Sequence, residues 1–233
     1  QWSVAGNISF DKNTVKKLYG DVDVIYNTNG NVIQREGNIF LGKSLNTIYT
    51  YRSGGVAQES NRAEWEGKNY NGKTVSPGDL FAKDISGPKG IPDGLVNQMD
   101  MEVVAKKDPK FYGGFATDLS YKGFALNTVF TYSYGAKKIS GYYEGLINSY
   151  GESMASTDLL NRWTPQNTNT NVPRVITNTS YNRYNPSDLD YAIQDASYLR
   201  LSALTLSYSL PEKLLTKWHV DKLRIYATGS NLF

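Results

Sequence analysis

The fold of this chain is decided by residues 111–134, which read FYGGFATDLSYKGFALNTVFTYSY. Mostly apolar or aromatic residues occupy every second position over 111–121 and again over 124–134, and mostly small or polar residues lie between them. Because successive side chains of a β-strand point to opposite faces, this spacing predicts two strands with one apolar face each. Lys122-Gly123 separates the runs and predicts a tight turn. The stretch is therefore expected to form an antiparallel hairpin whose strands, of about ten residues, can cross a bilayer when tilted.

Similar alternation predicts further strands in other parts of the chain. Residues 1–10 place Trp, Val, Ile and Phe on one face, and residues 222–233 show a weaker version of the pattern. Within 197–209 the apolar face changes midway, which predicts either a β-bulge near Ser202-Ala203 or a strand of which only the second half faces lipid. A strand is also expected at 14–20. Together these segments predict about six strands.

The connections between these strands alternate in length. In chain order they are a tight turn at 11–13, a long segment at 21–110, the turn at 122–123, a second long segment at 135–196, and a short helical connection at 210–220 opened by Pro211. Short turns on one side and long loops on the other are typical of outer-membrane barrels. We therefore expect an all-β chain that is part of a large transmembrane antiparallel β-barrel, with the long segments as extracellular loops.

A soluble β-sandwich is the alternative, because its strands also carry one apolar face. Polar residues on the opposite face (Asn7, Asp118, Asn127 and Arg224) fit bulk water in a sandwich and a wet lumen in a barrel. The barrel is favoured by aromatic residues at strand ends, since aromatic girdles lie at membrane interfaces: Phe10, Phe111, Tyr121, Phe124, Tyr134 and Tyr208. The corresponding functional alternative is a secreted carbohydrate-binding module.

Composition excludes several classes of function. The chain has no Cys and one His, His219, so thiol chemistry, a His-based triad and a multi-His metal site are excluded, and we expect neither a cofactor nor a metal. A net charge of +3 without a Lys/Arg run gives no support for nucleic-acid binding. No nucleophile or acid/base motif is present, and Asp118 and Lys122 are expected to be lumen and turn residues, so the chain is not expected to be an enzyme.

Several passages resemble one known family in the family's own order. The densest is residues 195–233, which begin DASYLRLSALTLSYSLP and end LRIYATGSNLF. Others are DPKFYGGF at 108–115 with SYKGF at 120–124, RWTPQN at 162–167 with VPR at 172–174, and PGDL at 77–80. These passages resemble the C-terminal half of the SusC/RagA-type TonB-dependent transporters of the Gram-negative outer membrane.

The resemblance implies a function that periodicity does not. Members import oligosaccharides or peptides with a SusD-like surface lipoprotein and are energised through TonB. The resemblance also implies that residues 1–233 are one portion of such a barrel, with the plug, the TonB-contacting segment and earlier strands outside it and a further strand after Phe233. Six strands cannot close a barrel of about 22, so the remaining strands are expected to complete it in the lipid.

The long segments hold the candidate site residues. Trp65, between Glu64 and Glu66, is expected to be the more exposed of the two aromatic candidates. An ordinary loop anchor is the favoured role, and contact with cargo or the lipoprotein is the alternative. Trp163 in RWTP is the second candidate, with packing at the loop base favoured. Residues 78–87 align with a family loop that resembles a calcium loop, but Pro88 and Lys89 replace the expected Asp-Gly, so an ordered polar loop without metal is expected.

Overall fold

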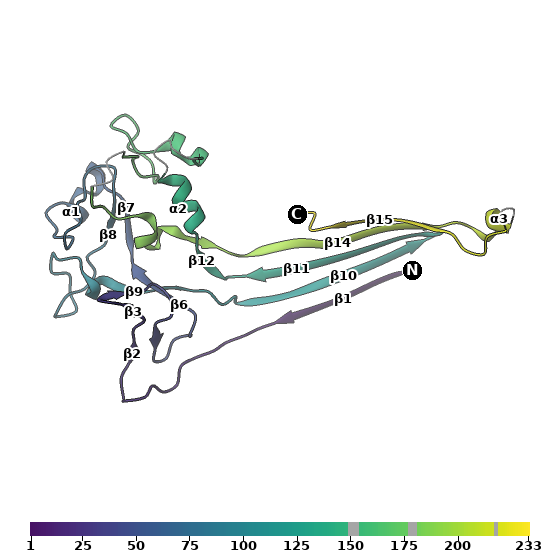
Figure 1. Cartoon of the computed structure of the whole chain (residues 1–233), viewed down its shortest axis with the longest axis horizontal. Helices are drawn as coiled ribbons and strands as arrows, with labels where there is room; N and C mark the ends of the chain where they lie inside the picture. Colours follow the sequence, from purple (N-terminus) through teal and green to yellow (C-terminus); the bar gives the residue numbers. More distant parts are fainter. Residues whose placement is uncertain (149–153, 177–180, 217–218) are drawn as a thin grey trace. The chain divides into compact units, whose positions relative to one another are not determined.

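The computed structural model describes residues 1–148, 154–176, 181–216 and 219–233. The chain divides into two compact units, which are coloured along the sequence in Figure 1. The first contains residues 1–12, 108–136 and 195–233, and the second contains residues 13–107 and 137–194. Among the described residues, no helix combines the length and the apolar character needed to cross a membrane.

The first unit is one antiparallel sheet in which spatial order follows chain order (Figure 1). The hairpin of β10 (Phe111–Tyr121) and β11 (Phe124–Tyr134) closes through Lys122 and Gly123, whose φ angles of 46° and 89° are the positive pair that a two-residue type I′ turn requires. The short helix α3 (Glu212–Leu215), preceded by Pro211, connects the last two strands as expected. The five strands are β1 (Trp2–Ser9), β10 (Phe111–Tyr121), β11 (Phe124–Tyr134), β14 (Tyr198–Ser209) and β15 (Arg224–Ser230).

The strand register gathers the apolar side chains on one face of the sheet. Phe115 lies opposite Gly6 on β1 and opposite Phe130 on β11, and its ring stacks on Phe130 with centroids 4.6 Å apart. This face stays open: Phe115 is 38% exposed and Leu119 is 49% exposed. A sandwich needs a second sheet over such a face, and the described residues of the first unit form only this one. An open apolar face is what lipid requires of a barrel wall.

The predicted strand at 14–20 is wrong, so the sheet has five strands instead of six. Val15 is instead tied to another part of the second unit: its amide donates to the Lys43 carbonyl, and its carbonyl accepts from the Gly42 amide. The predicted bulge is confirmed, because the β11–β14 register shifts where Phe130 pairs with Leu201 and Ser202 is skipped. Long and short connections still alternate along the sheet.

Gly113 permits a close approach between three strands. The Tyr132 hydroxyl on β11 donates to the Asn7 carbonyl on β1 at 3.0 Å, and it passes over Gly113 on β10 to do so. A Cβ at Gly113 would lie 2.2 Å from that carbonyl oxygen and 2.8 Å from the hydroxyl. We expect Gly113→Ala to destabilise the sheet by about 1–3 kcal/mol through overpacking. Gly6→Ala is the control, since a Cβ at Gly6 would lie 3.4 Å from its nearest neighbour, an ordinary contact distance. If the full-length protein in detergent unfolded at the same midpoint with either substitution, the packing argument would be contradicted.

The second unit is built from short elements contributed by both long segments. Its two-stranded pairs are β2 (Val24–Ile25) with β5 (Ile39–Phe40), β3 (Thr28–Asn29) with β4 (Val32–Ile33), β6 (Thr47–Tyr51) with β9 (Met101–Lys106), β7 (Ser53–Val56) with β8 (Leu80–Ala82), and β12 (Lys137–Ile139) with β13 (Ile193–Asp195). Its helices are α1 (Arg62–Trp65), α2 (Gly141–Ile147) and short 3-10 turns at Glu59–Asn61, Gln98–Asp100, Thr157–Asn161, Pro186–Asp188 and Asp190–Ala192.

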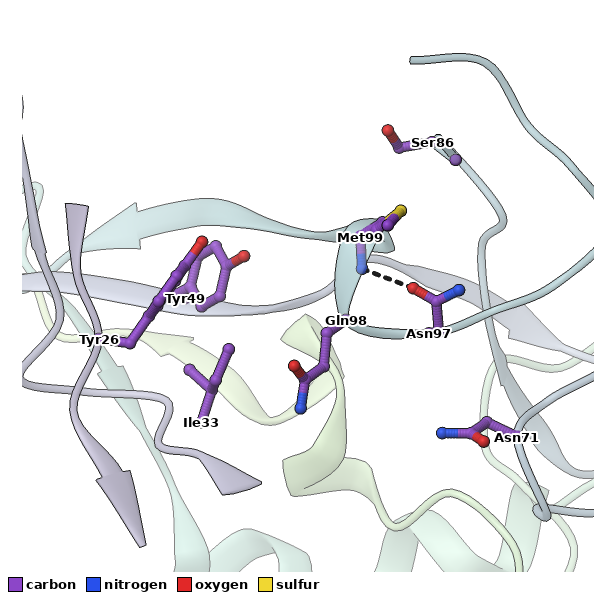
Figure 2. A pocket seen from close by; sticks show the side chains of 9 residues that line it. Tyr26, Ile33, Tyr49, Asn71, Ser86, Asn97, Gln98 and Met99 are labelled. Atoms are coloured by element: carbon purple, nitrogen blue, oxygen red, sulfur yellow. Dashed lines mark hydrogen bonds between the residues drawn. The ribbon is translucent and has the colours of Figure 1, made fainter. Parts of the chain in front are cut away.

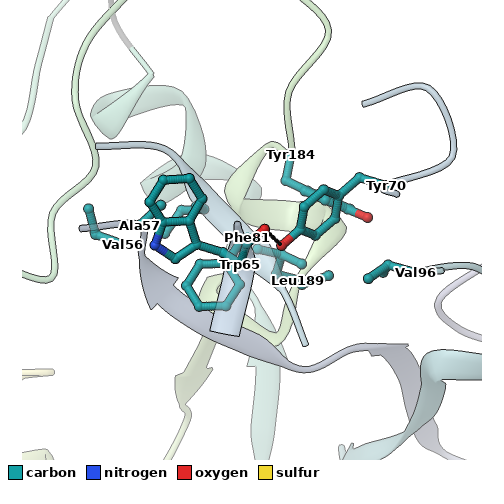
Figure 3. Packing of buried hydrophobic residues seen from close by; sticks show 10 residues of the cluster. Val56, Ala57, Trp65, Tyr70, Phe81, Val96, Tyr184 and Leu189 are labelled. Atoms are coloured by element: carbon teal, nitrogen blue, oxygen red, sulfur yellow. Dashed lines mark hydrogen bonds between the residues drawn. The ribbon is translucent and has the colours of Figure 1, made fainter. Parts of the chain in front are cut away.

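A hydrophobic core holds the two long segments together (Figure 3). Phe81 is fully buried, and the backbone of Gly54 lies so near its ring that a Cβ there would come within 2.0 Å of it. Tyr184 and Leu189 from the second segment pack into the core supplied by the first. A hydrogen bond from a side chain to the backbone reinforces the junction, since the Thr50 hydroxyl donates to the Asp188 carbonyl at 2.8 Å. The two segments therefore form a folded unit.

Candidate functional site

The sheet face opposite the apolar one is lined by polar side chains that bond across the strands. The Asp118 carboxylate accepts hydrogen bonds from the Asn127 amide on β11 and from the Ser3 hydroxyl on β1. Further along, the Thr205 and Thr228 hydroxyls lie 2.9 Å apart, and the Arg224 guanidinium donates to the Ser207 hydroxyl at 2.8 Å. Lys122 lies at the turn, with its ammonium 5.2 Å from the Tyr121 ring centre. Such a hydrogen-bonded polar face suits contact with water and polar solutes.

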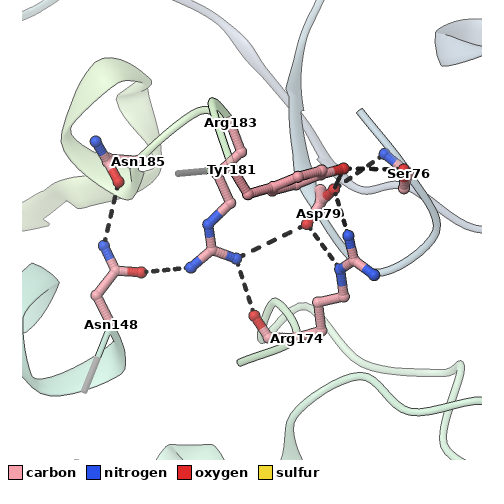
Figure 4. Close-up of polar contacts among 7 residues, drawn as sticks. All are labelled: Ser76, Asp79, Asn148, Arg174, Tyr181, Arg183 and Asn185. Carbon is pink, nitrogen blue, oxygen red and sulfur yellow. Dashed lines mark hydrogen bonds and ion pairs between the residues drawn. The ribbon is translucent and has the colours of Figure 1, made fainter. Parts of the chain in front are cut away.

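A buried ionic cluster centres on Asp79 in the second unit (Figure 4). Arg174 donates to the two Asp79 carboxylate oxygens at 2.9 and 3.0 Å, and Arg183 lies 3.8 Å from the same carboxylate. The Ser76 amide and the Tyr181 hydroxyl donate to it as well, at 3.0 and 2.9 Å. Asp79 belongs to the first long segment and both arginines to the second, so the cluster ties the segments by charge.

Burial raises the pKa of Tyr181, and its bond to Asp79 adds to this effect. Arg183 is 7% exposed and is fully engaged: its guanidinium also donates to the Arg174 carbonyl and to the Asn148 side chain, each at 3.0 Å. Every charged member of the cluster therefore has a partner inside the unit. This arrangement is suited to holding the fold together and leaves no free charge for a ligand.

The structure places Trp65 in the core, and the expected exposure of its side chain is wrong. Trp65 is 8% exposed, and its indole N–H donates to the Gln58 carbonyl at 3.1 Å and to the Asn61 side chain at 3.0 Å. It ends the one-turn helix α1, and its neighbours are exposed: Glu64 within the helix and Glu66 just after it. A turn of helix moves neighbouring side chains about 100° apart, so acidic neighbours on a helix do not imply exposure.

We expect Trp65→Phe to destabilise the second unit by about 1–2 kcal/mol, since the ring is kept while two hydrogen bonds and part of the packing are lost. Hydrogen-exchange protection of residues 56–66 measures this loss. Binding of the transported cargo by the folded Trp65→Phe variant should be unchanged. Lost binding with unchanged protection would instead assign Trp65 a direct contact.

Trp163 lies partly exposed at the edge of the same core. Its ring covers Gly78, where a Cβ would lie 2.5 Å from a ring carbon, and its backbone amide donates to the Val172 carbonyl at 2.9 Å. The structure does not bring Trp163 together with Trp65 in a shared open pocket: Trp163 packs over Gly78, and Trp65 is buried at the end of α1. Contact of either residue with cargo stays a prediction.

The carboxylates of the calcium-like loop are bound by the protein itself. Asp79 belongs to the ionic cluster, and Asp84 accepts from the Lys68 ammonium at 2.8 Å and from the Gly94 amide at 2.8 Å. Burial opposes ionisation of Asp84, but the bonds from Lys68 and the backbone outweigh it and lower the pKa of this carboxyl. Among the described residues, no group of three or more His, Asp or Glu side chains is arranged to hold a metal ion.

The second unit holds an open pocket of about 660 Å³ that no sequence motif predicts (Figure 2). None of its nine lining residues carries a charge. They come from several stretches of the first long segment, each too short to show a pattern. The polar lining residues are Tyr26, Tyr49, Asn71, Ser86, Asn97 and Gln98.

Comparison with known proteins agrees with this architecture. The chain is similar to TonB-dependent receptor P3 of Formosa agariphila, with 34% identity over 99% of this chain, and to TonB-dependent receptor P26 of the same organism, with 27% identity over 60%. It spans 22% and 14% of the lengths of those relatives. No family model matches the chain.

Solved structures show the same fold. The "Structure of the RagAB peptide transporter" superposes on the whole chain with a TM-score of 0.69 at 21% identity, covering 23% of that chain. The RagAB peptide importer in its 'closed-closed' state gives a TM-score of 0.66 at 22% identity, covering 24% of that chain. A sheet with one open apolar face and one polar face, superposing in full on this transporter, is part of the wall of a transmembrane β-barrel.

Taken together, identity of 34% along the whole chain to a TonB-dependent receptor and full structural overlap with RagAB fit a portion of a SusC/RagA-type TonB-dependent transporter.

Proposed function

We propose that this chain supplies wall strands and extracellular loops to an outer-membrane transporter of a Gram-negative bacterium that imports oligosaccharides or peptides. The sheet separates lipid from a polar lumen, and the second unit supplies the folded extracellular loops. The chain carries no catalytic role. The observation that carries the proposal is the sheet with two different faces: an open apolar face that includes Phe115, and a hydrogen-bonded polar face that includes Asp118.

The proposal extends to the rest of the barrel. In the five-stranded sheet, β1 and β15 are edge strands, and edge backbone groups facing hydrocarbon cost several kcal/mol each when unpaired. Further strands of the same transporter pair with these edges and close the barrel. A plug and a TonB-contacting segment belong to the same polypeptide, and TonB supplies the energy for uptake.

A SusD-like surface lipoprotein is the proposed partner on the extracellular side. The supporting comparison is RagAB, whose solved structures carry a transporter paired with such a protein. RagAB is a peptide importer, so peptide import is supported by likeness of fold. Oligosaccharide import is the other cargo class of the family that the sequence resembles.

The full-length transporter that contains this chain should fractionate with the outer membrane, require detergent for extraction and co-purify with a surface lipoprotein. Uptake of labelled oligosaccharides and labelled peptides by the native bacterium should then fall to background when either the transporter or TonB is deleted. Extraction in aqueous buffer without detergent, or uptake that is unchanged in both deletion strains, would refute the proposal.

A further inference from the structure

Resting on the proposed function, we infer that the uncharged pocket of the second unit (Figure 2) is a binding subsite for a neutral oligosaccharide. At about 660 Å³ it has the volume of a small-molecule site and accommodates a few sugar rings. The site lies wholly within residues of one long segment, so its shape is set by the second unit alone.

One wall of the pocket is aromatic. Tyr26 is 41% exposed, and its ring lies 5.7 Å from the ring of Tyr49 and 6.1 Å from the ring of Phe40. Tyr49 is itself buried at 6% exposure, so it fixes Tyr26 from behind. An aromatic ring held with part of its surface open to a pocket can pack on the apolar C–H face of a pyranose.

The opposite wall carries amides and a hydroxyl. Figure 2 shows Asn71 and Asn97 across the pocket from Tyr26, with Gln98 between the two walls. Amide side chains offer both donors and acceptors, which matches sugar hydroxyls that also do both. The combination of one apolar ring and several amides is suited to a neutral polyhydroxylated ligand.

The amide wall is rigid because a buried carboxylate organises the backbone behind it. Asp100 is fully buried, and its carboxylate accepts from the amides of Ile85, Ser86 and Asn97 at 2.7 to 3.0 Å. This joins the two lining stretches that contain Ser86 and Asn97. The Asn97 side chain in turn accepts from the Met99 amide at 2.8 Å. A wall fixed before binding loses little entropy when a ligand arrives.

The absence of charge among the lining residues favours a sugar over a free peptide. Peptide sites use an exposed strand edge, a groove for alternate side chains, or charged groups that capture a terminus. A charged terminus entering a pocket without a counter-ion loses hydration with no ionic compensation. The nine residues around this pocket supply none of the charged groups.

The test is binding of the purified full-length transporter to a glycan array of neutral hexasaccharides, followed by titration of the strongest binder. Tyr26→Ala should weaken that binding about tenfold, and Tyr26→Phe should retain it because the ring remains. Gln98→Ala, at an exposed position, should weaken binding about fivefold. Tyr19→Ala is the matched control: Tyr19 is 98% exposed in the same unit and does not line the pocket, so affinity should stay unchanged.

Three results would overturn the inference. The first is no binding to any neutral glycan. The second is equal glycan affinity for the Tyr26→Ala and Tyr19→Ala variants. The third is that an N-acetylated, C-amidated hexapeptide binds in a manner that depends on Tyr26 while the glycans do not bind. TonB-dependent uptake is measured in the same strains. Intact uptake with no Tyr26 effect refutes the subsite alone, whereas loss of all TonB dependence refutes the transport function.

Discussion

Replacing Asp79 with alanine is expected to destabilise the second unit by about 3–5 kcal/mol, because it leaves a buried cationic group without its partner. Asp79 is completely buried and binds Arg174 through both carboxylate oxygens, with Arg183 next to it. Removing the carboxylate also orphans the Ser76 amide and the Tyr181 hydroxyl. Hydrogen exchange of peptides that cover β7 and β8 in the full-length transporter measures the loss, which should reach every element of the core.

The control for this experiment is an ion pair of similar length at the surface. Glu102 lies 2.5 Å from Arg52, but both side chains are at least 40% exposed, so Glu102→Ala should cost under about 1 kcal/mol. If the two variants lost protection equally, burial would not explain the strength of the Asp79 cluster. Loss confined to residues beside Asp79 would show that the two long segments do not unfold as one unit.

A charge at Phe115 is expected to produce the second large effect. Phe115 lies in the middle of β10 on the open apolar face, stacked on Phe130. An arginine on the lipid face of a barrel near the bilayer midplane costs about 2–4 kcal/mol. Phe115→Arg should therefore lower the guanidinium midpoint of the full-length transporter in phospholipid vesicles and reduce the yield of inserted barrel.

The neighbouring residue gives a control with the same substitution. Ala116 pairs with Ala5 and Val129 on the polar face, so Ala116→Arg points away from lipid and should change stability by less than about 1 kcal/mol. Equal losses for the two variants would mean that both faces meet the same environment. A larger loss at Ala116 would invert the assignment of the lipid side.

The sheet could be predicted from sequence because its signal is local and repeated. The strand bounds expected at 111–121 and 124–134 are those of β10 and β11, and the change of apolar face in 197–209 located the bulge at Ser202. Alternation over about ten residues leaves one pairing register that keeps every apolar side chain on one side. The strand expected at 14–20 was wrong because a short run offers too few alternations to distinguish a strand from an extended loop.

The second unit could not be predicted because its core has no sequence period. Phe81 comes from a three-residue strand, Trp65 from a one-turn helix, and Leu189 from an extended stretch more than one hundred positions later in the numbering. Elements this short contain too few residues to show a periodic spacing of apolar side chains, and their packing depends on contacts that only the folded chain defines. The pocket has the same origin, since Tyr26 and Gln98 lie far apart along the chain.

The hairpin of β10 and β11 also has a consequence for how the second unit assembles. Residues 13–107 and 137–194 are separated by the hairpin residues, but the Lys110 amide donates to the Tyr134 carbonyl at 2.7 Å. Once this bond forms, the two long segments are joined by a short bridge instead of a free loop. The entropic free-energy cost of bringing them together then falls by about 1–2 kcal/mol. The hairpin thus holds the two segments close together while the second unit folds. Lengthening the Lys122-Gly123 turn should slow folding of the second unit while leaving its final contacts unchanged.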